Sequence, residues 1–159
     1  NLFYESIQQN GRIFVSGSGH SSIVAQEAFY RAGGLVSIKP IWLKSLLITE
    51  NAEMSTHLER ISGIAEVTLN EHQPNNKDCL VVVSNSGRNA YGIELAIKAK
   101  SIGCRTVALT SIQHSSNVES RHSSGKRLFE LCDIFIDKEI RIRIGNHLFN
   151  LFFLLSKRI

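Results

Sequence analysis

The apolar run from Cys79 to Val83 constrains the fold of this 159-residue chain more than any other feature. All five residues are apolar, so polar side chains do not alternate with them as they would in a strand with one face in water. A strand of this kind belongs inside a sheet that is covered on both faces, which is the usual situation of a parallel sheet.

Four further short runs have the same character, and helical patterns lie between them. The runs are residues 12–16, 35–38, 106–109 and 134–136. Apolar residues recur at helical spacing at positions 24, 28 and 32, at 54, 58, 61, 65 and 69, and at 93, 96 and 97. Because no hairpin signal joins successive runs, this alternation predicts an α/β fold, a three-layer α/β/α sandwich around a five-stranded parallel sheet with right-handed crossovers.

Size and composition favour one domain. Apolar residues make up 43% of the chain, and no linker rich in Pro, Gly or Ser interrupts it, so a single domain over residues 1–159 is predicted. The net charge of +4 comes from scattered basic residues without interleaved aromatic residues, so no nucleic-acid partner is expected. No apolar segment approaches the roughly 20 residues of a spanning helix, so no membrane partner is expected either.

The three cysteines, Cys79, Cys104 and Cys132, show no C-x-x-C spacing. Their odd number and spacing argue against a disulfide framework and against a zinc knuckle. Thiols of this kind are typical of a reducing cytoplasm, which is the predicted location. The six histidines show no ligand spacing either, so neither a metal site nor a cofactor is predicted.

Ligands of parallel α/β sheets bind at the carboxyl ends of the strands, so the segments that follow the strand runs are the candidates for a site. Three of these segments, residues 17–22, 84–89 and 110–114, are rich in hydroxyl groups. The first has Ser22 where a dinucleotide fingerprint needs its third glycine, and the second predicted strand lacks the carboxylate that would hold a ribose. A complete Walker loop and a Gly-x-Ser-x-Gly nucleophile elbow are also absent from the sequence.

A strand followed by glycine and hydroxyl residues that open a helix suits a phosphate monoester, because backbone N–H groups, a positive helix end and O–H donors occur together. Ser84-Asn-Ser-Gly87 is the better phosphate candidate, since both serines can donate and Gly87 lets the backbone come close. The first loop would then bind sugar hydroxyls. The alternative is that these serines only cap helices that begin near Ile23 and Ala90. The predicted binding residues are Ser18, Gly19, Ser21, Ser22, Ser84, Asn85, Ser86, Gly87, Arg88, Asn89, Thr110, Ser111 and His122.

These residues resemble the SIS (sugar isomerase) domain family, which binds phosphosugars. Ser84-x-Ser86-Gly87 after a central strand matches the phosphate-binding signature of that family, although Asn89 stands where threonine is usual. A narrower resemblance, to the UPF0309 group related to phosphoheptose isomerases, is carried by residues 17–21, 29–35, 84–89 and 120–128. It covers about residues 11–137 and implies a flavodoxin-like five-stranded parallel sheet and a homodimer. Residues 138–159 depart from the family and are interpreted as a divergent tail.

Aldose–ketose isomerisation needs a base that moves a proton between adjacent carbons and an acid that protonates the carbonyl oxygen. The candidates are His20 in the first loop, Glu27 two turns into the helix that follows, and His114 after the fourth predicted strand. A surface position is expected for Glu59 and Glu66, because carboxylates are mostly exposed.

The sequence therefore predicts a domain that binds a phosphorylated sugar or amino sugar, and it leaves three functions open. One is isomerase chemistry. The second is a non-catalytic phosphosugar sensor, although no helix-turn-helix for DNA is present. The third is ether cleavage of an N-acetylmuramic acid 6-phosphate-like substrate, for which Arg88 would bind the lactyl carboxylate.

Overall fold

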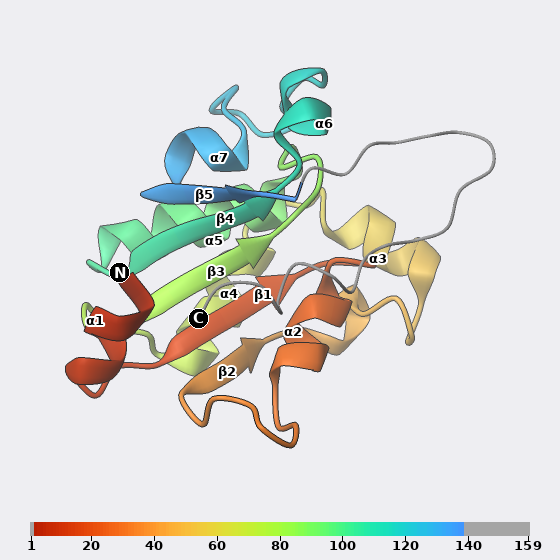
Figure 1. The fold of residues 1–159 in the computed structure, drawn as a ribbon. Coiled ribbons are helices and arrows are strands. Elements are labelled where there is room, and N and C mark those ends of the chain that lie inside the picture. Colours follow the sequence, from red (N-terminus) through yellow and green to blue (C-terminus); the bar gives the residue numbers. More distant parts are fainter. Residues whose placement is uncertain (1, 139–159) are drawn as a thin grey trace.

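Five parallel strands form the centre of the computed structural model, which describes residues 2–138 (Figure 1). The order in the sheet is β2-β1-β3-β4-β5 and every pairing is parallel, so the predicted fold class is confirmed. The strands are β1 (Ile13–Gly17), β2 (Ile38–Ile41), β3 (Cys79–Val83), β4 (Arg105–Thr110) and β5 (Ile134–Asp137).

The central strand β3 is buried along its whole length, and its side chains divide between two apolar clusters. Leu80 and Val82 belong to the cluster on one face of the sheet, whereas Cys79, Val81 and Val83 belong to the cluster on the other. This division follows from the two-residue period of a strand, and it explains why the run has no polar member.

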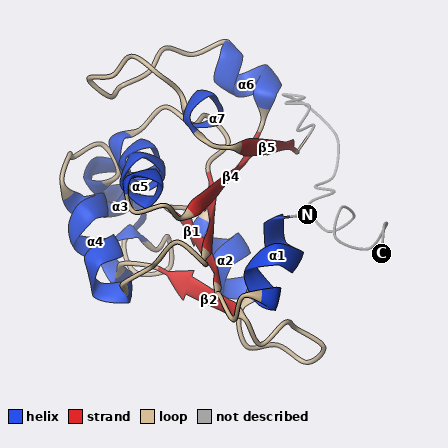
Figure 2. Ribbon diagram, turned by 90° about the vertical axis from the view of Figure 1, so that its left-hand side faces the viewer, coloured by secondary structure: helices blue, strands red, loops and turns tan. Residues whose placement is uncertain are grey.

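Helices cover both faces, as Figure 2 shows. One face carries α1 (Leu2–Gln8) and α2 (Ser22–Ala28), whose apolar side chains join the cluster around Val81. The other face carries α4 (Ile64–His72), α5 (Ala90–Ser101) and α7 (Leu128–Leu131). The remaining short helices are α3 (Ala52–Leu58), α6 (Ile112–Ser116) and the 3-10 turn η1 (Lys44–Leu46).

Two predicted elements differ from the structure. The second strand does not lie at residues 35–38 but begins at Ile38, and Leu35 and Val36 are 59% and 90% exposed. Pro40 lies within β2, which is possible because β2 is an edge strand and an edge strand tolerates proline. The helical pattern over positions 54–69 is divided into α3 and α4, since Gly63 adopts φ +92° between them.

The expectation that every strand is covered on both faces is wrong for β5. Ile134, Phe135 and Ile136 of this edge strand retain 46%, 52% and 44% exposure. Within residues 2–138, none of the helices has the length and apolar character that a membrane crossing requires. Apart from Lys138, the predicted divergent tail lies outside the described residues.

Candidate functional site

The strand order of the sheet reverses between β1 and β3, and the loops that follow these two strands lie side by side at that point. The chain leaves β1 through α2 on one face and leaves β3 through α5 on the other face. Ligands of doubly wound sheets bind outside the carboxyl ends of the strands at such a switch point.

The loop after β3 turns its carbonyl groups toward one neighbouring segment. The carbonyl oxygens of Ser86, Gly87 and Arg88 accept hydrogen bonds from Ser115 Oγ (2.7 Å), from the Leu128 amide (2.8 Å) and from the Arg121 amide (2.8 Å). Gly87 adopts φ +56°, and a Cβ at this position would lie 3.1 Å from that of Leu128. Glycine is therefore required here both for the backbone conformation and for the close approach of Ser115 and Leu128, which flank the 116–127 segment.

The amide groups of the same loop are largely unused. The amides of Ser86, Arg88 and Asn89 meet no acceptor among the described residues, and neither does the Ser86 hydroxyl. Ser84 Oγ accepts from the Gly87 amide at 3.1 Å, which leaves its own proton available to a ligand. These donors stand at the positive end of the twelve-residue helix α5, so the loop has the chemistry of an anion cradle.

Helix capping does not account for most of these polar residues. Ser21 and Asn89 occupy the N-cap positions of α2 and α5, but neither side chain makes a capping hydrogen bond. Ser111 does cap α6 through the His114 amide, and Thr110 Oγ1 donates to the Asn85 carbonyl at 3.1 Å. The two helices of the capping alternative therefore have no side-chain cap, Ser111 caps a different helix, and Thr110 supports the cradle from behind.

The loop after β1 is braced by its own polar groups. Ser22 Oγ donates to the Gly19 carbonyl at 2.7 Å, and the Gly19 amide donates to the Leu46 carbonyl at 2.8 Å. Only Ser18 reaches across to another part of the site, since its Oγ donates to Glu59 Oε2 at 2.5 Å.

Glu59 joins the two loops. It follows directly after α3, and its second oxygen, Oε1, accepts from Asn89 Nδ2 at 2.7 Å. Asn89 in turn accepts from Arg121 Nη1 through Oδ1 at 3.1 Å. Because arginine only donates, this contact fixes the amide of Asn89 so that its nitrogen faces the carboxylate. Glu59 is therefore partly buried and bonded to both loops, instead of being a free surface carboxylate.

Arg121 lies within electrostatic range of this carboxylate and of two further arginines. Desolvation, and then the charges of Arg88 and Arg60, lower the pKa of Arg121, while the charge of Glu59 opposes the shift. Sequence reasoning missed Arg60 and Arg121, because only the fold brings the end of α3 and the 116–127 segment to the end of β3.

The three predicted catalytic residues are distributed differently. His20 is exposed in the loop after β1, at the carboxyl edge of the sheet. Glu27 forms an ion pair with Arg31 on the exposed surface of α2. His114 lies within α6 and is partly buried. The structure brings none of them into contact with the pair of Glu59 and Asn89.

His122 and Asn85 are engaged by other charged groups. His122 Nε2 lies 3.7 Å from Glu94 Oε1, and its Nδ1 accepts from the Ser124 amide at 3.2 Å. Asn85 Oδ1 accepts from Lys138 Nζ at 2.8 Å, and burial lowers the pKa of Lys138 to about 8.

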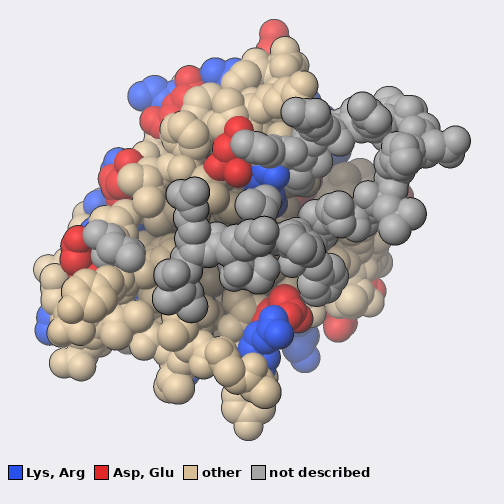
Figure 3. All heavy atoms as spheres, in the orientation of Figure 1, with Lys and Arg blue, Asp and Glu red and all other residues tan. Residues whose placement is uncertain are grey.

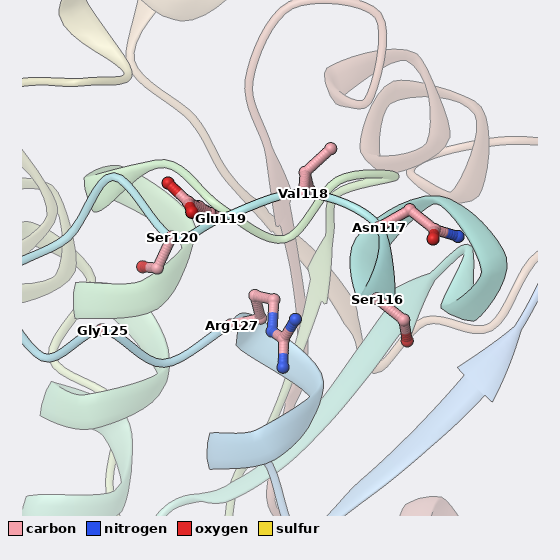
Figure 4. Close-up of a pocket in the computed structure, with 7 residues that line it drawn as sticks. All are labelled: Ser116, Asn117, Val118, Glu119, Ser120, Gly125 and Arg127. Carbon is pink, nitrogen blue, oxygen red and sulfur yellow. The ribbon is translucent and has the colours of Figure 1, made fainter.

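A hollow of about 590 Å³ lies beside this site, within the 116–127 segment (Figure 4). Its lining consists of Ser116, Asn117, Val118, Glu119, Ser120, Gly125 and Arg127. The one cation among them, Arg127, is already paired with Glu130 at 2.9 Å, and neither loop of the switch point contributes to the lining. The chemistry therefore favours the switch point over the hollow as the ligand site.

Metal and thiol chemistry receive no support from the described part of the chain. No three His, Cys, Asp or Glu side chains of residues 2–138 are grouped so that they could hold a metal ion. Burial raises the pKa of Cys79 to about 11 and the pKa values of Cys104 and Cys132 to about 12, so these thiols are protonated at neutral pH.

The Lys and Arg side chains visible in Figure 3 are interspersed with Asp and Glu.

A family model described as the SIS domain matches residues 1–111. The chain belongs to the SIS domain family. Among curated SIS relatives, a UPF0309 protein of Halalkalibacterium halodurans is 44% identical over 137 residues, which is 86% of this chain and 57% of the relative. A UPF0309 protein of Streptomyces coelicolor is 37% identical over 143 residues, 89% of this chain and 57% of the relative. The resemblance found in the sequence is thus confirmed, and the chain spans a little over half the length of these relatives.

The SIS fold is also recognisable in a solved structure. Phosphoheptose isomerase GmhA from Neisseria gonorrhoeae superposes with a TM-score of 0.51 at 21% identity, over 76% of this chain and 65% of the other. At this level of identity the similarity concerns the fold.

Proposed function

We propose that this SIS domain binds a phosphorylated sugar or amino sugar across the switch point, with the phosphate on the loop from Ser84 to Asn89. The observation that carries the proposal is the set of unused donors at the start of α5, namely the amides of Ser86, Arg88 and Asn89 and the hydroxyls of the two serines. Membership of the SIS family supports the same class of ligand.

The sugar would extend from the phosphate toward Glu59 and Ser18. A ligand that spans from one loop to the other passes the carboxylate that both loops hold, through Ser18 and Asn89. Gly19, Ser21 and His20 would then face the far end of the sugar, from the loop after β1.

Isomerase chemistry is the reaction that this arrangement supports best. A carboxylate fixed by two hydrogen bonds beside a bound sugar can abstract the proton next to the carbonyl group and return it to the adjacent carbon. We assign this role to Glu59 in preference to Glu27, whose carboxylate is paired with Arg31. His20 is the candidate acid, since it is the histidine of the same loop as Ser18. A phosphosugar sensor would use the same cradle without proton transfer.

The binding proposal is tested by thermal unfolding in the presence of fructose 6-phosphate, glucosamine 6-phosphate and their unphosphorylated counterparts. We expect only the phosphorylated sugars to raise the melting temperature, and we expect Ser86→Ala combined with Ser84→Ala to remove the effect. Ser116→Ala, an exposed serine of α6, is the matched control and should leave it unchanged. An undiminished shift in the double variant would overturn the assignment of the cradle.

A second measurement separates enzyme from sensor. Proton NMR in deuterated water reports whether a bound sugar phosphate exchanges its C2 proton with solvent. Exchange supports isomerase chemistry, whereas binding without exchange for every sugar that binds supports the sensor. A cytoplasmic location and a homodimer stay predictions.

A further inference from the structure

The arginines of the described chain fall into two groups. Four of the seven have a carboxylate partner: Arg12 with Asp78, Arg31 with Glu27, Arg105 with Glu5 and Arg127 with Glu130. Within residues 2–138 the other three, Arg60, Arg88 and Arg121, form no ion pair. We call these three the arginine trio; Arg121 lies near enough to Arg88, to Arg60 and to Glu59 for their charges to act on it.

The trio is assembled from three separate parts of the chain. Arg60 follows α3, Arg88 follows the glycine of the cradle, and Arg121 comes from the 116–127 segment. The Arg121 amide donates to the Arg88 carbonyl at 2.8 Å, so the backbones of the second and third members are directly linked. Like charges held this close together repel one another unless an anion lies among them.

One side-chain atom of the trio is buried without a hydrogen-bond partner among the described residues. Arg88 Nε is buried, and it makes no hydrogen bond in the described structure. A buried cationic donor without an acceptor is costly, because it has lost its hydration and gained nothing in return. Such an atom beside the unused amides of the cradle points to an anionic acceptor in the same place.

The charges of the trio and of Glu59 indicate what kind of anion would bind there. Three guanidinium groups and the carboxylate of Glu59 leave two positive charges to be balanced. A phosphate monoester above its second pKa of about 6 carries two negative charges, so one phosphoryl group neutralises the site. A sugar that also carried a carboxylate would leave an excess negative charge beside Glu59.

We propose that the arginine trio is the counter-charge for a single phosphoryl dianion, and that the ligand is a sugar monophosphate without any further acidic group. The inference rests on the proposed function and narrows it. It disfavours a substrate with a lactyl carboxylate, for which Arg88 would have been the recognition residue. It also makes the 116–127 segment part of the site, because that segment supplies Arg121.

The test is titration calorimetry with fructose 6-phosphate, 6-phosphogluconate, fructose and inorganic phosphate. We expect fructose 6-phosphate to bind at least about tenfold more tightly than 6-phosphogluconate, which adds a carboxylate to a sugar phosphate of similar size. Arg88→Met and Arg121→Met should each weaken fructose 6-phosphate about tenfold or more and reduce its dependence on salt. Arg31→Met, which removes an arginine that is already paired, should leave the affinity unchanged.

The possible failures are distinguishable. Tighter binding of 6-phosphogluconate, or undiminished fructose 6-phosphate binding in both trio variants, overturns the inference while the proposed function stands. If inorganic phosphate binds in a way that depends on the trio but no sugar phosphate binds, the proposed function fails and the charge assignment holds. If neither ligand binds the native chain, both are wrong.

Discussion

Glu59 is placed between the two loops by groups that leave its carboxylate little freedom. Ser18 and Asn89 each donate to one of its oxygens, and Arg121 orients Asn89 from behind. A base that is fixed in this way is already directed at a ligand, so the conformational cost of reaching a reactive geometry is small.

Glu59→Gln is predicted to separate binding from chemistry. Glutamine preserves the shape and most of the hydrogen bonds, so the thermal shift by fructose 6-phosphate should persist. Exchange of the C2 proton should fall about 100-fold or more, because the amide is not a base. Glu27→Gln is the matched control on α2, and this variant should exchange the C2 proton of the sugar phosphate at the native rate. Equal loss of exchange in the two variants would contradict the assignment of Glu59.

Gly87 tests the cradle at a single residue. We expect Gly87→Ala to destabilise the fold by about 1–3 kcal/mol, because alanine is strained at φ +56° and its Cβ would meet Leu128 and Ser115. It should also abolish the thermal shift by phosphosugars, since Ser115 and Leu128, which flank the 116–127 segment, pack against this residue. Chemical denaturation and thermal shift measure the two effects.

Gly125→Ala is the control for that substitution. Gly125 has φ +69° but nothing within 4 Å of its Cβ position, so this variant has the backbone strain without the contact. It should keep the response to phosphosugars. A Gly87→Ala variant that also kept this response would show that the close approach is not needed for binding.

The residues of the cradle could be predicted from the sequence, whereas the residues around it could not. Ser84, Ser86 and Gly87 follow an apolar strand directly, and a local pattern is enough to identify them. Glu59 and Arg121 lie 25 or more positions away along the chain and reach the cradle only through the fold. The sequence places His20 in the first loop as a catalytic candidate, but the structure brings it into contact with neither Glu59 nor Asn89.

At the scale of elements, β1 and β3 are tied together at the amino edge of the sheet, opposite the site. Asp78 is 1% exposed and accepts from the Arg12 amide at 2.7 Å, from Arg12 Nη2 at 2.8 Å and from the Asn75 amide at 2.8 Å. Burial alone would raise the pKa of Asp78, but the hydrogen bonds from Arg12 and Asn75 outweigh it and lower the pKa below its usual value.

This shift predicts how stability changes with pH. Because the folded-state pKa of Asp78 is the lower one, its contribution is complete above the unfolded pKa of about 3.9 and is lost as the pH falls toward the folded value. Asp78→Asn should cost about 3 kcal/mol at pH 7 and reduce the acid dependence, as measured by urea unfolding at pH 7 and pH 3.5. Glu66→Gln removes one partner of an exposed ion pair with Lys98, and it should change neither the stability at pH 7 nor its dependence on acid. If the Asp78→Asn variant were as stable as the native chain, the hydrogen bonds of Asp78 would not contribute to the stability of the fold.

The elements whose observed bounds differ from the sequence prediction are those whose position depends on tertiary packing. The apolar spacing of positions 54–69 is continuous, but α3 ends at Leu58 and α4 begins only after Gly63. Between them the Glu59 carbonyl accepts from the Tyr91 amide of α5 at 3.0 Å, which anchors this residue beside the site. The second strand is shifted to Ile38–Ile41, where it pairs with β1. Hydrophobic periodicity predicts whether an element is a helix or a strand more reliably than it predicts the residues at which that element begins and ends.

At the scale of the whole molecule, the order β2-β1-β3-β4-β5 explains why two loops that are more than 60 positions apart become neighbours. The sequence predicted parallel strands and covered faces, and from these the carboxyl edge as the place for a ligand. It pointed to His122 of the 116–127 segment, but it could not predict how that segment is placed, because Ser115 and Leu128 at its two ends are held by the carbonyls of Ser86 and Gly87.

The central claim is that a sugar phosphate binds at the switch point, and amide-resolved NMR of the isotopically labelled chain tests it most directly. On addition of fructose 6-phosphate, we predict the largest chemical-shift changes at the amides of Ser86, Arg88 and Asn89, and none of comparable size with fructose. Changes centred instead on the lining of the hollow, at Ser116 to Ser120, would contradict the account.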